Sequence, residues 1–251
     1  MNIKLIVATH KPYRMPEDAV YFPVHAGAEG KESIGYTGDN TGDNISEKNR
    51  NYCELTALYW AWKNLEADYL GLVHYRRHFS SGAMSGDKYK RILTGSQLSG
   101  ILDGCDVVVP TARNYVIETT YSQYVHAHNA ADLDTTRLIL SEKYPEYVSA
   151  FDSVMDSTSG HRFNMFIMRR DKFDSYCSWL FDILFELENR LDISGYDAYN
   201  SRVFGFVSER LLDVWLRANN IPFIEQPYVF MEKQNWITKG FSFLKRKFFR
   251  R

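Results

Sequence analysis

The sequence predicts an α/β protein built as one domain, because strand-like and helix-like segments alternate along the chain. Short apolar runs that end in polar or turn residues recur, and segments with apolar residues at helical spacing lie between them. Such alternation is typical of a sheet covered by helices. With 251 residues and 45% apolar content, the chain is long enough to bury a sizeable core.

The predicted strands begin almost at the first residue. The run at 3–8 has one lysine and is too short for a secretory signal, so we expect it to be the first strand. The predicted strands are residues 3–8, 69–74, 107–110, 165–168 and 223–226. The predicted helices are residues 52–64, 95–102, 132–143, 144–157, 172–189 and 205–218. No window approaches the roughly 20 apolar residues of a membrane-spanning helix, so we do not expect the chain to cross a membrane.

One long stretch, residues 12–51, is expected to be a loop. It contains five glycines and a doubled Thr-Gly-Asp-Asn at 37–44, which indicates local turns and not a repeat protein. Loops of this length inside a compact domain are usually functional or disordered.

The charge is unevenly distributed. The net charge is −1, yet residues 1–238 carry 24 basic residues against 31 acidic ones, while residues 239–251 carry six basic residues and no acid. The acidic body argues against a nucleic-acid partner. On a helix, Phe241, Leu244 and Phe248 would form an apolar stripe among the cations, which is typical of an anchor on anionic lipid. We therefore divide the chain into a domain at 1–238 and a basic amphipathic tail at 239–251, with a frayed soluble terminus as the alternative.

The three cysteines, Cys53, Cys105 and Cys177, are odd in number and widely spaced. Each lies in an apolar pattern and none forms a CxxC pair. They are expected to be reduced side chains of a cytoplasmic protein.

The most informative segment is residues 41–79. A polar loop at 43–49 precedes an aromatic helix, a buried strand follows, and that strand ends in His74-Tyr75-Arg76-Arg77-His78. Cations beyond the carboxyl end of a strand lie where open α/β sheets hold ligands, and the guanidinium fork suits phosphate. His10 and Lys11 follow the first strand and should approach the same crevice.

Common nucleotide and metal motifs are absent. The sequence has no HExxH, no DxD after a predicted strand, no GxGxxG, no P-loop and no GxSxG. His126 and His128 form an HxH pair that is more often polar packing than a metal site. A site that balances a diphosphate with His74, Arg76 and Arg77 remains the best-supported chemistry, since oriented cations can do this electrostatic work without a metal. The alternative is that Arg76 and Arg77 form ordinary ion pairs with carboxylates on the protein surface.

A reaction at a hydroxyl would also need a base. Glu209, in the polar triplet Ser208-Glu209-Arg210 of an otherwise apolar helix, is the first candidate, although a carboxylate in a first helical turn is also an ordinary dipole partner. Asp132 and Glu54 are further candidates. The polar residues before the strand at 165–168 could line a sugar, and these are His161, Arg162 and Asn164.

Four strings of the chain resemble a bacterial family of capsular and exopolysaccharide glycosyltransferases long listed as a domain of unknown function. They are TGDNISEKNRNYCELTALYWAWKN, YLGLVHYRRHF, FNMFIMRRDKFDSYCSWLFDIL and RVFGFVSERLLDVWL. The resemblance spans nearly the whole chain and is weakest at 80–103. It implies a GT-A-like, Rossmann-like fold with a mixed, mostly parallel sheet flanked by helices. It also implies hexose transfer, galactose in pyranose or furanose form among others, from a UDP-sugar to a lipid-linked oligosaccharide.

The resemblance carries family positions onto Thr9, His10, Lys11, Asp43, Asn44, Ser46, Lys48, Asn49, Glu54, His74, Arg76, Arg77, Asn164, Ser208 and Glu209. We interpret Glu209, His74 and Arg76 as catalytic. The expected donor-binding residues are Thr9, His10, Lys11, Asp43, Asn44, Lys48, Asn49, Arg77 and Asn164. The expected acceptor-binding residues are His128, Ser208 and Arg210.

The sequence thus predicts an inverting glycosyltransferase of surface-polysaccharide assembly, cytoplasmic and peripheral on the inner face of the plasma membrane. No cofactor is assigned, and Mn²⁺ or Mg²⁺ could enter with UDP, because the missing DxD leaves metal dependence open. Retention of configuration stays open too. The rival prediction is a non-catalytic sugar- or nucleotide-binding scaffold of a membrane polysaccharide assembly complex.

Overall fold

The computed structural model describes residues 1–115 and 117–232. Within these residues, the main sheet has nine strands, and its central path runs β10-β6-β9-β4-β1-β2-β3. The strands are β1 (Ile3–Thr9), β2 (Tyr21–His25), β3 (Thr37–Gly38), β4 (Tyr69–His74), β5 (Arg77–Phe79), β6 (Val107–Pro110), β9 (Phe166–Arg169), β10 (Ile224–Gln226) and β11 (Tyr228–Phe230). A separate two-stranded ladder joins β7 (Arg113–Asn114) to β8 (Ser159–Gly160).

Most of the sheet is parallel. β1 pairs in parallel with β2 and β4, β2 with β3, and β6 with β10, whereas β9 is antiparallel to both β4 and β6. β5 turns back from β4 and pairs with β11. The predicted fold class is confirmed: this is a mixed, mostly parallel sheet flanked by helices, consistent with a GT-A-like α/β fold.

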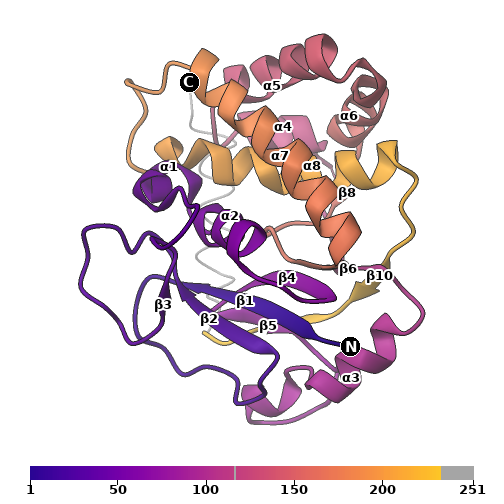
Figure 1. Ribbon diagram of the computed structural model, residues 1–251. Coiled ribbons are helices and arrows are strands. Elements are labelled where there is room, and N and C mark those ends of the chain that lie inside the picture. The colour runs from indigo at the N-terminus through magenta and orange to yellow at the C-terminus, as the bar shows by residue number, and fades with distance from the viewer. Residues whose placement is uncertain (116, 233–251) are drawn as a thin grey trace.

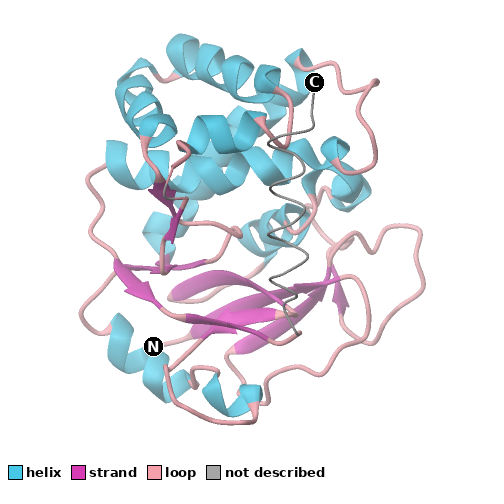
Figure 2. Cartoon of the chain, turned by 180° about the vertical axis from the view of Figure 1, so that it is seen from behind, coloured by secondary structure: helices cyan, strands magenta, loops and turns pink. Residues whose placement is uncertain are grey.

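Helices cover both faces of the sheet unequally (Figures 1 and 2). One face carries α3 (Gly95–Leu102), and the other carries the larger helical layer. That layer comprises α1 (Asn49–Tyr52), α2 (Leu55–Asn64), α4 (Thr120–Val125), α5 (Ala130–Lys143), α6 (Val148–Asp156), α7 (Arg170–Arg190) and α8 (Val203–Ala218). Short 3-10 helices span Ser46–Lys48, Lys88–Arg91, Pro145–Tyr147 and Asn200–Arg202.

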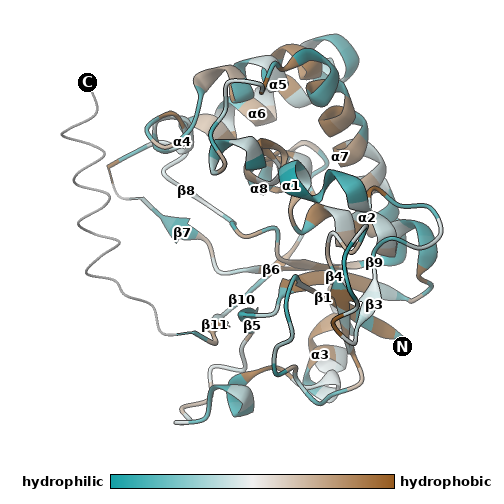
Figure 3. Ribbon diagram, turned by 90° about the vertical axis from the view of Figure 1, so that its left-hand side faces the viewer, coloured by the Kyte–Doolittle hydropathy of each residue, from teal (hydrophilic) through white to brown (hydrophobic). Residues whose placement is uncertain are grey.

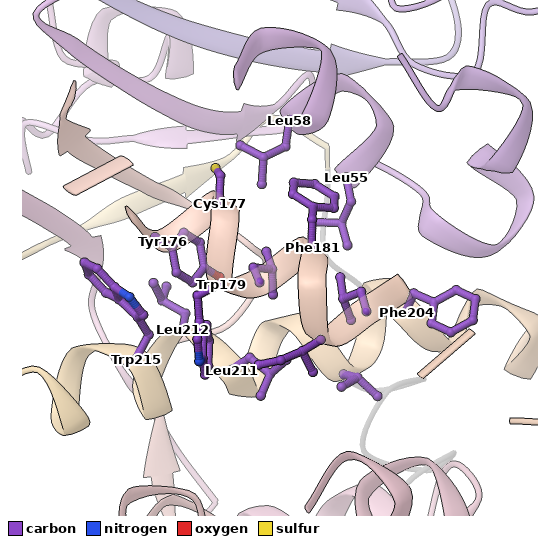
Figure 4. Close-up of a cluster of buried hydrophobic side chains, with 14 of the residues drawn as sticks. Leu55, Leu58, Tyr176, Cys177, Trp179, Phe181, Phe204, Leu211, Leu212 and Trp215 are labelled. Carbon is purple, nitrogen blue, oxygen red and sulfur yellow. The ribbon is translucent and has the colours of Figure 1, made fainter. Parts of the chain in front are cut away.

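The strand alternation divides the apolar side chains between two cores. In β1, Ile6 and Ala8 pack under the large helical layer, while Leu5 and Val7 pack toward α3. The apolar strands at the centre are visible in Figure 3. In the larger core, the long helix α7 lies between α2 and α8, and Figure 4 shows Phe181 and Trp215 among the buried side chains there. This burial holds the helical layer over the sheet.

Close packing between strands explains why residue 71 is a glycine. A Cβ on Gly71 in β4 would lie 2.5 Å from the Phe166 carbonyl oxygen and 2.6 Å from Leu5 Cδ2. Only glycine lets β9 pair with β4 at this point, and the pairing places the segment before β9 beside the end of β4.

Three expectations about elements were wrong. The stretch at 12–51 is not all loop, because β2 forms inside it and pairs with β1 over five residues. The helix predicted at 52–64 is broken, since α1 ends at Tyr52 and α2 begins at Leu55. The helix predicted at 144–157 is a 3-10 turn followed by α6.

The predicted tail at 239–251 lies outside the described residues, so the division at 238 stays a prediction. Among residues 1–115 and 117–232, no helix has the length and apolarity needed to cross a bilayer.

Candidate active site

A cavity of about 670 Å³ opens at the edge of the sheet where parallel strands end. Thr9 ends β1, His74 ends β4 and Ala26 directly follows β2, and all three line the cavity. The opposite wall belongs to the helical layer and includes Asn49 in α1 and Phe206 in α8. Ligands of open α/β sheets bind at this carboxyl edge.

The cavity lining is rich in positive charge. Seven arginines face three glutamates in the lining. The arginines are Arg50, Arg76, Arg77, Arg113, Arg162, Arg202 and Arg210, and the glutamates are Glu54, Glu118 and Glu209. A concave surface of one predominant sign concentrates a ligand of the opposite charge, so this cavity suits an anion.

Arg77 carries a charge that no described carboxylate pairs with. Its guanidinium lies 3.7 Å from the centre of the Phe163 ring and 5.1 Å from that of Phe230, and its buried Nε has no hydrogen-bond partner among the described residues. Burial lowers the pKa of Arg77 to about 10, partly offset by Glu209. Burying a cation without a partner is costly, and a bound anion would remove that cost.

Arg76 and Lys11 share one carboxylate. Glu232 lies 3.9 Å from Arg76 Nη1 and 3.8 Å from Lys11 Nζ, and all three side chains are more than one-third exposed. These ion pairs are long and solvated, so they contribute little to stability. Arg76 and Lys11 can therefore leave Glu232 and pair with another anion at a small cost in free energy.

His74 is held as a neutral imidazole. Its Nε2 donates a hydrogen bond to the Phe163 carbonyl oxygen at 2.7 Å. Burial, with the nearby charge of Arg77, lowers the pKa of His74 to about 3. His74 therefore fixes the loop before β9 and does not act as the cation that the sequence interpretation expected near neutral pH.

A hydrogen-bonded set lies behind the cavity wall. Asn164 Nδ2 donates to Glu54 Oε1 at 2.7 Å, and Ser208 Oγ donates to Asn164 Oδ1 at 2.9 Å. Asn164 and Ser208 are buried. The set joins α2, the β9 loop and α8, so Asn164 and Ser208 support the wall instead of reaching into the cavity.

Glu209 lines the cavity from α8. Its Oε2 accepts a hydrogen bond at 3.0 Å from Arg210, which is buried and also bonds the Phe206 carbonyl and Gln123. The Glu209 side chain is 20% exposed. It can therefore accept a proton from a molecule in the cavity while Arg210 holds its orientation.

Unusual backbone conformations cluster at the cavity. Cys53, Phe163 and Asn164 have positive φ angles of 55°, 82° and 52°. Cys53 and Phe163 line the cavity, and Cys53 separates α1 from α2 so that Glu54 begins the second helix beside the site. Non-glycine residues in such regions cost of order 1–3 kcal/mol each and concentrate at functional sites.

The helical wall combines an oriented histidine with aromatic rings. His126 Nδ1 lies 2.8 Å from Oε1 of Glu118, whose side chain is 4% exposed whereas that of His126 is 50% exposed. In the same turn, His128 packs against Phe206 and Tyr199, with ring centres 4.2 and 5.5 Å away. This wall therefore combines histidines and aromatic rings with the lining arginines Arg50, Arg202 and Arg210 of the helical layer.

The chain resembles known proteins in both sequence and fold. Residues 4–220 match the family described as domain of unknown function DUF4422. The chain belongs to this family. It is also similar to a solved structure described as the apo form of the WbbM bifunctional glycosyltransferase, with 32% sequence identity and a TM-score of 0.86. The match covers 93% of this chain and 46% of that one, so the chain spans about half of its relative. No curated protein matches significantly.

In this DUF4422 domain, the structure brings one part of the predicted donor site together. Thr9, His10, Asn49 and Arg77 line the cavity. Thr9 Oγ1 donates to the Lys11 carbonyl at 2.7 Å and so shapes the turn after β1. Burial, together with Lys11, lowers the pKa of His10, which leaves its imidazole largely neutral at pH 7.

Five other predicted donor residues lie outside the cavity lining, and these are Lys11, Asp43, Asn44, Lys48 and Asn164. Lys48 pairs with Glu188 at 2.7 Å, and Asp43 accepts a hydrogen bond from Tyr59 at 3.2 Å. Asn44 caps its own turn by accepting from Ser46 N. Ser46, in the same segment, donates to Asp39, a buried carboxylate that also accepts from Gly27 N and Ala28 N.

The remaining candidate residues lie in different parts of the molecule. Asp132 is buried and accepts from Tyr124 and Tyr196, away from the cavity lining. Arg162 lines the main cavity, whereas His161 lines a second pocket of about 360 Å³, where its Nδ1 lies 2.5 Å from Asp213.

Several lining residues were missed by sequence reasoning. Glu118, Arg113 and Arg202 follow no motif and come from three separate segments, so only tertiary packing brings them together. Among residues 1–115 and 117–232, no group of three or more His, Cys, Asp or Glu side chains is arranged to hold a metal ion.

Proposed function

We propose that this protein is a glycosyltransferase that moves a hexose, with galactose in pyranose or furanose form favoured, from a UDP-sugar to a lipid-linked oligosaccharide of a bacterial surface polysaccharide. Family membership and the similarity to a bifunctional glycosyltransferase support transferase chemistry. The observation that carries the proposal is Arg77, a partly buried cation that forms no ion pair with any described carboxylate, at the carboxyl edge of the sheet.

The diphosphate of the donor would meet Arg77 and Arg76, with Lys11 nearby. Negative charge grows on the diphosphate as the sugar leaves, so fixed cations at this position lower the barrier. His74 would act through the Phe163 loop, which it holds against Arg77. Thr9, His10 and Asn49 would contact the nucleotide, and Asp43, Asn44 and Lys48 are left out of this assignment.

Glu209 would act as the general base. An acceptor hydroxyl oxygen attacks the anomeric carbon, the bond from that carbon to the UDP oxygen breaks, and the hydroxyl proton passes to Glu209. Displacement in one step inverts the anomeric configuration. His128 and Arg210 would contact the acceptor, with Ser208 supporting the helix beneath them.

The first experiment measures thermal stabilisation by nucleotides and nucleotide sugars, each with EDTA and with Mn²⁺. We expect a shift specific to UDP and one UDP-sugar, because only a ligand that binds the folded state stabilises it. Survival of the shift in EDTA supports an arginine site, and loss in EDTA assigns the diphosphate to a metal carried with UDP. No shift with any nucleotide contradicts the proposal.

Turnover separates an enzyme from the rival scaffold. Glu209→Gln should keep the UDP shift but lower sugar transfer on the order of 100-fold, the scale expected for losing a general base. Slow UDP-sugar hydrolysis without acceptor should be present in the parent protein. A parent that binds UDP-sugar without any hydrolysis or transfer supports the scaffold instead.

Placement on the inner face of the plasma membrane, through residues 239–251, remains part of this proposal. Co-sedimentation of the full chain with anionic vesicles, compared with a chain ending at residue 238, tests it.

A further inference from the structure

One part of the cavity offers an aromatic face to solvent. Tyr199 is 48% exposed, and it is one of the aromatic side chains that line the cavity. It directly precedes the 3-10 helix Asn200–Arg202, which leads into α8, and it lines the cavity on the helical wall. Its position is separate in sequence and element from the arginines of the β4–β5 turn.

The ring of Tyr199 rests on a fixed stack. It lies nearly parallel to the His128 ring, at 16° with centres 5.5 Å apart, and 5.1 Å from the Phe206 ring. His128 in turn packs on Tyr124, which is fully buried. The stack continues from solvent into the core, so the exposed ring is pre-positioned.

The backbone around Tyr199 is also fixed. The Asp197 carboxylate accepts hydrogen bonds from the backbone N–H of Tyr199 at 3.0 Å and of Asn200 at 2.7 Å. Asn200 Oδ1 lies 3.0 Å from Nδ1 of His128, which joins the loop to the stack. A binding surface that is rigid before the ligand arrives loses less entropy on binding.

Polar groups border this face. His126, oriented by the buried carboxylate of Glu118, comes from the same turn as His128. Arg202 lies 5.3 Å from the centre of the Phe206 ring. A hexopyranose needs this combination, because its axial C–H bonds present an apolar face while its hydroxyl groups project from the ring edge.

We propose that Tyr199, backed by His128 and Phe206, forms the subsite that stacks the accepting sugar ring, with His126 and Arg202 reading its hydroxyl groups. This inference rests on the proposed function. It means that the protein recognises the acceptor by its sugar and not by its lipid. The uracil ring of the donor could also stack on an aromatic face, but its diphosphate is drawn to Arg77 on the other wall, so the sugar is favoured.

Binding is tested without turnover. Saturation-transfer NMR uses methyl glycosides of galactose, glucose, N-acetylglucosamine and rhamnose, which have no lipid tail, with UDP present. We expect the ring protons of at least one glycoside to be saturated by the parent and by Tyr199→Phe, and not by Tyr199→Ala. Equal saturation by Tyr199→Ala, or none from any glycoside with the parent, overturns the proposal.

Kinetics provide the second readout. With UDP-galactose and the corresponding octyl glycosides, Tyr199→Ala should raise the glycoside KM roughly tenfold or more, as expected for losing an aromatic contact. The UDP thermal shift and the acceptor-independent hydrolysis should match the parent, and Tyr199→Phe should stay within about twofold. A lost UDP shift in Tyr199→Ala would assign the ring to uracil and overturn the proposal. Absence of the UDP shift in the parent would instead contradict the proposed function.

Discussion

At the residue scale, Arg77 shows a conflict between stability and ligand binding. Its guanidinium is packed against Phe163 while its Nε lacks a partner among the described residues. The same burial that lowers its pKa to about 10 would strengthen its attraction to a bound phosphate, since charges interact more strongly in a medium of low dielectric constant. Functional sites often retain such unfavourable groups.

We therefore expect Arg77→Met to separate the two properties. Methionine can keep the apolar contact with Phe163 without a buried charge, so the melting temperature should rise by about 2–4 °C, the change that corresponds to roughly 1 kcal/mol in a protein of this size. Turnover should fall on the order of 100-fold, with loss of the UDP thermal shift. The control is Arg169→Gln, because Arg169 is an exposed arginine that pairs with Asp106 and Asp171. A less stable Arg77→Met that still binds UDP would refute this account.

His74 predicts a pH dependence of stability. Its folded pKa, about 3, lies below the ordinary histidine value of about 6.5. Between these values the unfolded chain binds a proton that the folded chain excludes, so stability is complete above pH ~6.5 and falls as the pH drops toward ~3.

His74→Gln should flatten this acid limb, because glutamine can still donate to the Phe163 carbonyl but does not titrate. Urea unfolding at several pH values from 7 to 4 measures the effect. The free energy of unfolding of the variant, relative to the parent, should improve as the pH falls. A constant difference across that range would show that His74 has the same pKa in the folded and the unfolded chain, and would contradict this account.

At the element scale, the break between α1 and α2 places Glu54 at the cavity. Cys53 occupies φ 55° and ψ −129°, a region that disfavours any side chain, and Arg202 Nε donates to its sulfur at 3.1 Å. The helical pattern of 52–64 did not reveal this break, because a strained residue leaves no sequence signature.

Glycine and alanine variants test the strain directly. Cys53→Gly and Cys53→Ala both lose the thiol, but only glycine adopts this backbone freely, so the glycine variant should be more stable by about 1 kcal/mol. At Lys63, exposed in α2, the order should reverse, since glycine costs about 1 kcal/mol relative to alanine inside a helix. Chemical denaturation of the four proteins gives both differences. An alanine variant at position 53 as stable as its glycine counterpart would exclude strain there.

The elements also show what sequence patterns can predict. The strands at 69–74 and 107–110 and the helix at 95–102 were predicted with their observed bounds. The helix is also delimited by a capping box in which Thr94 and Gln97 bond each other's backbone N–H. β2 was missed because Pro23 interrupts its short apolar run, and proline lowers the prediction of a strand.

The candidate site was only half predictable for a similar reason. His74 ends a strand and Arg76 and Arg77 come just after it, so chain order places all three at the carboxyl edge of the sheet. No comparable rule predicts which residues form the helical wall. Glu118, Tyr199 and Arg202 meet there because α4 and α8 pack in the same layer, a tertiary fact that periodicity does not encode.

At the scale of the whole molecule, charge is separated between body and cavity. The chain carries a net charge of −1, yet its described cavity has seven arginines against three glutamates. The cavity lies between the sheet edge and the helical layer, so its field is focused by walls of low dielectric constant. An anionic donor should therefore be attracted to the cavity although the protein as a whole is slightly acidic.

This arrangement predicts that UDP binding weakens with salt. Mobile ions screen charges beyond roughly 10 Å at 0.1 M and beyond roughly 3 Å at 1 M, so raising NaCl from about 0.05 to about 0.5 M should increase the Kd of UDP about tenfold. Uridine, which lacks the diphosphate, serves as the control ligand and should bind weakly with little salt dependence. Isothermal titration at a series of ionic strengths measures both ligands. A Kd of UDP that does not change with salt would mean that hydrogen bonds and base contacts dominate, and the arginines of the cavity would then need another explanation.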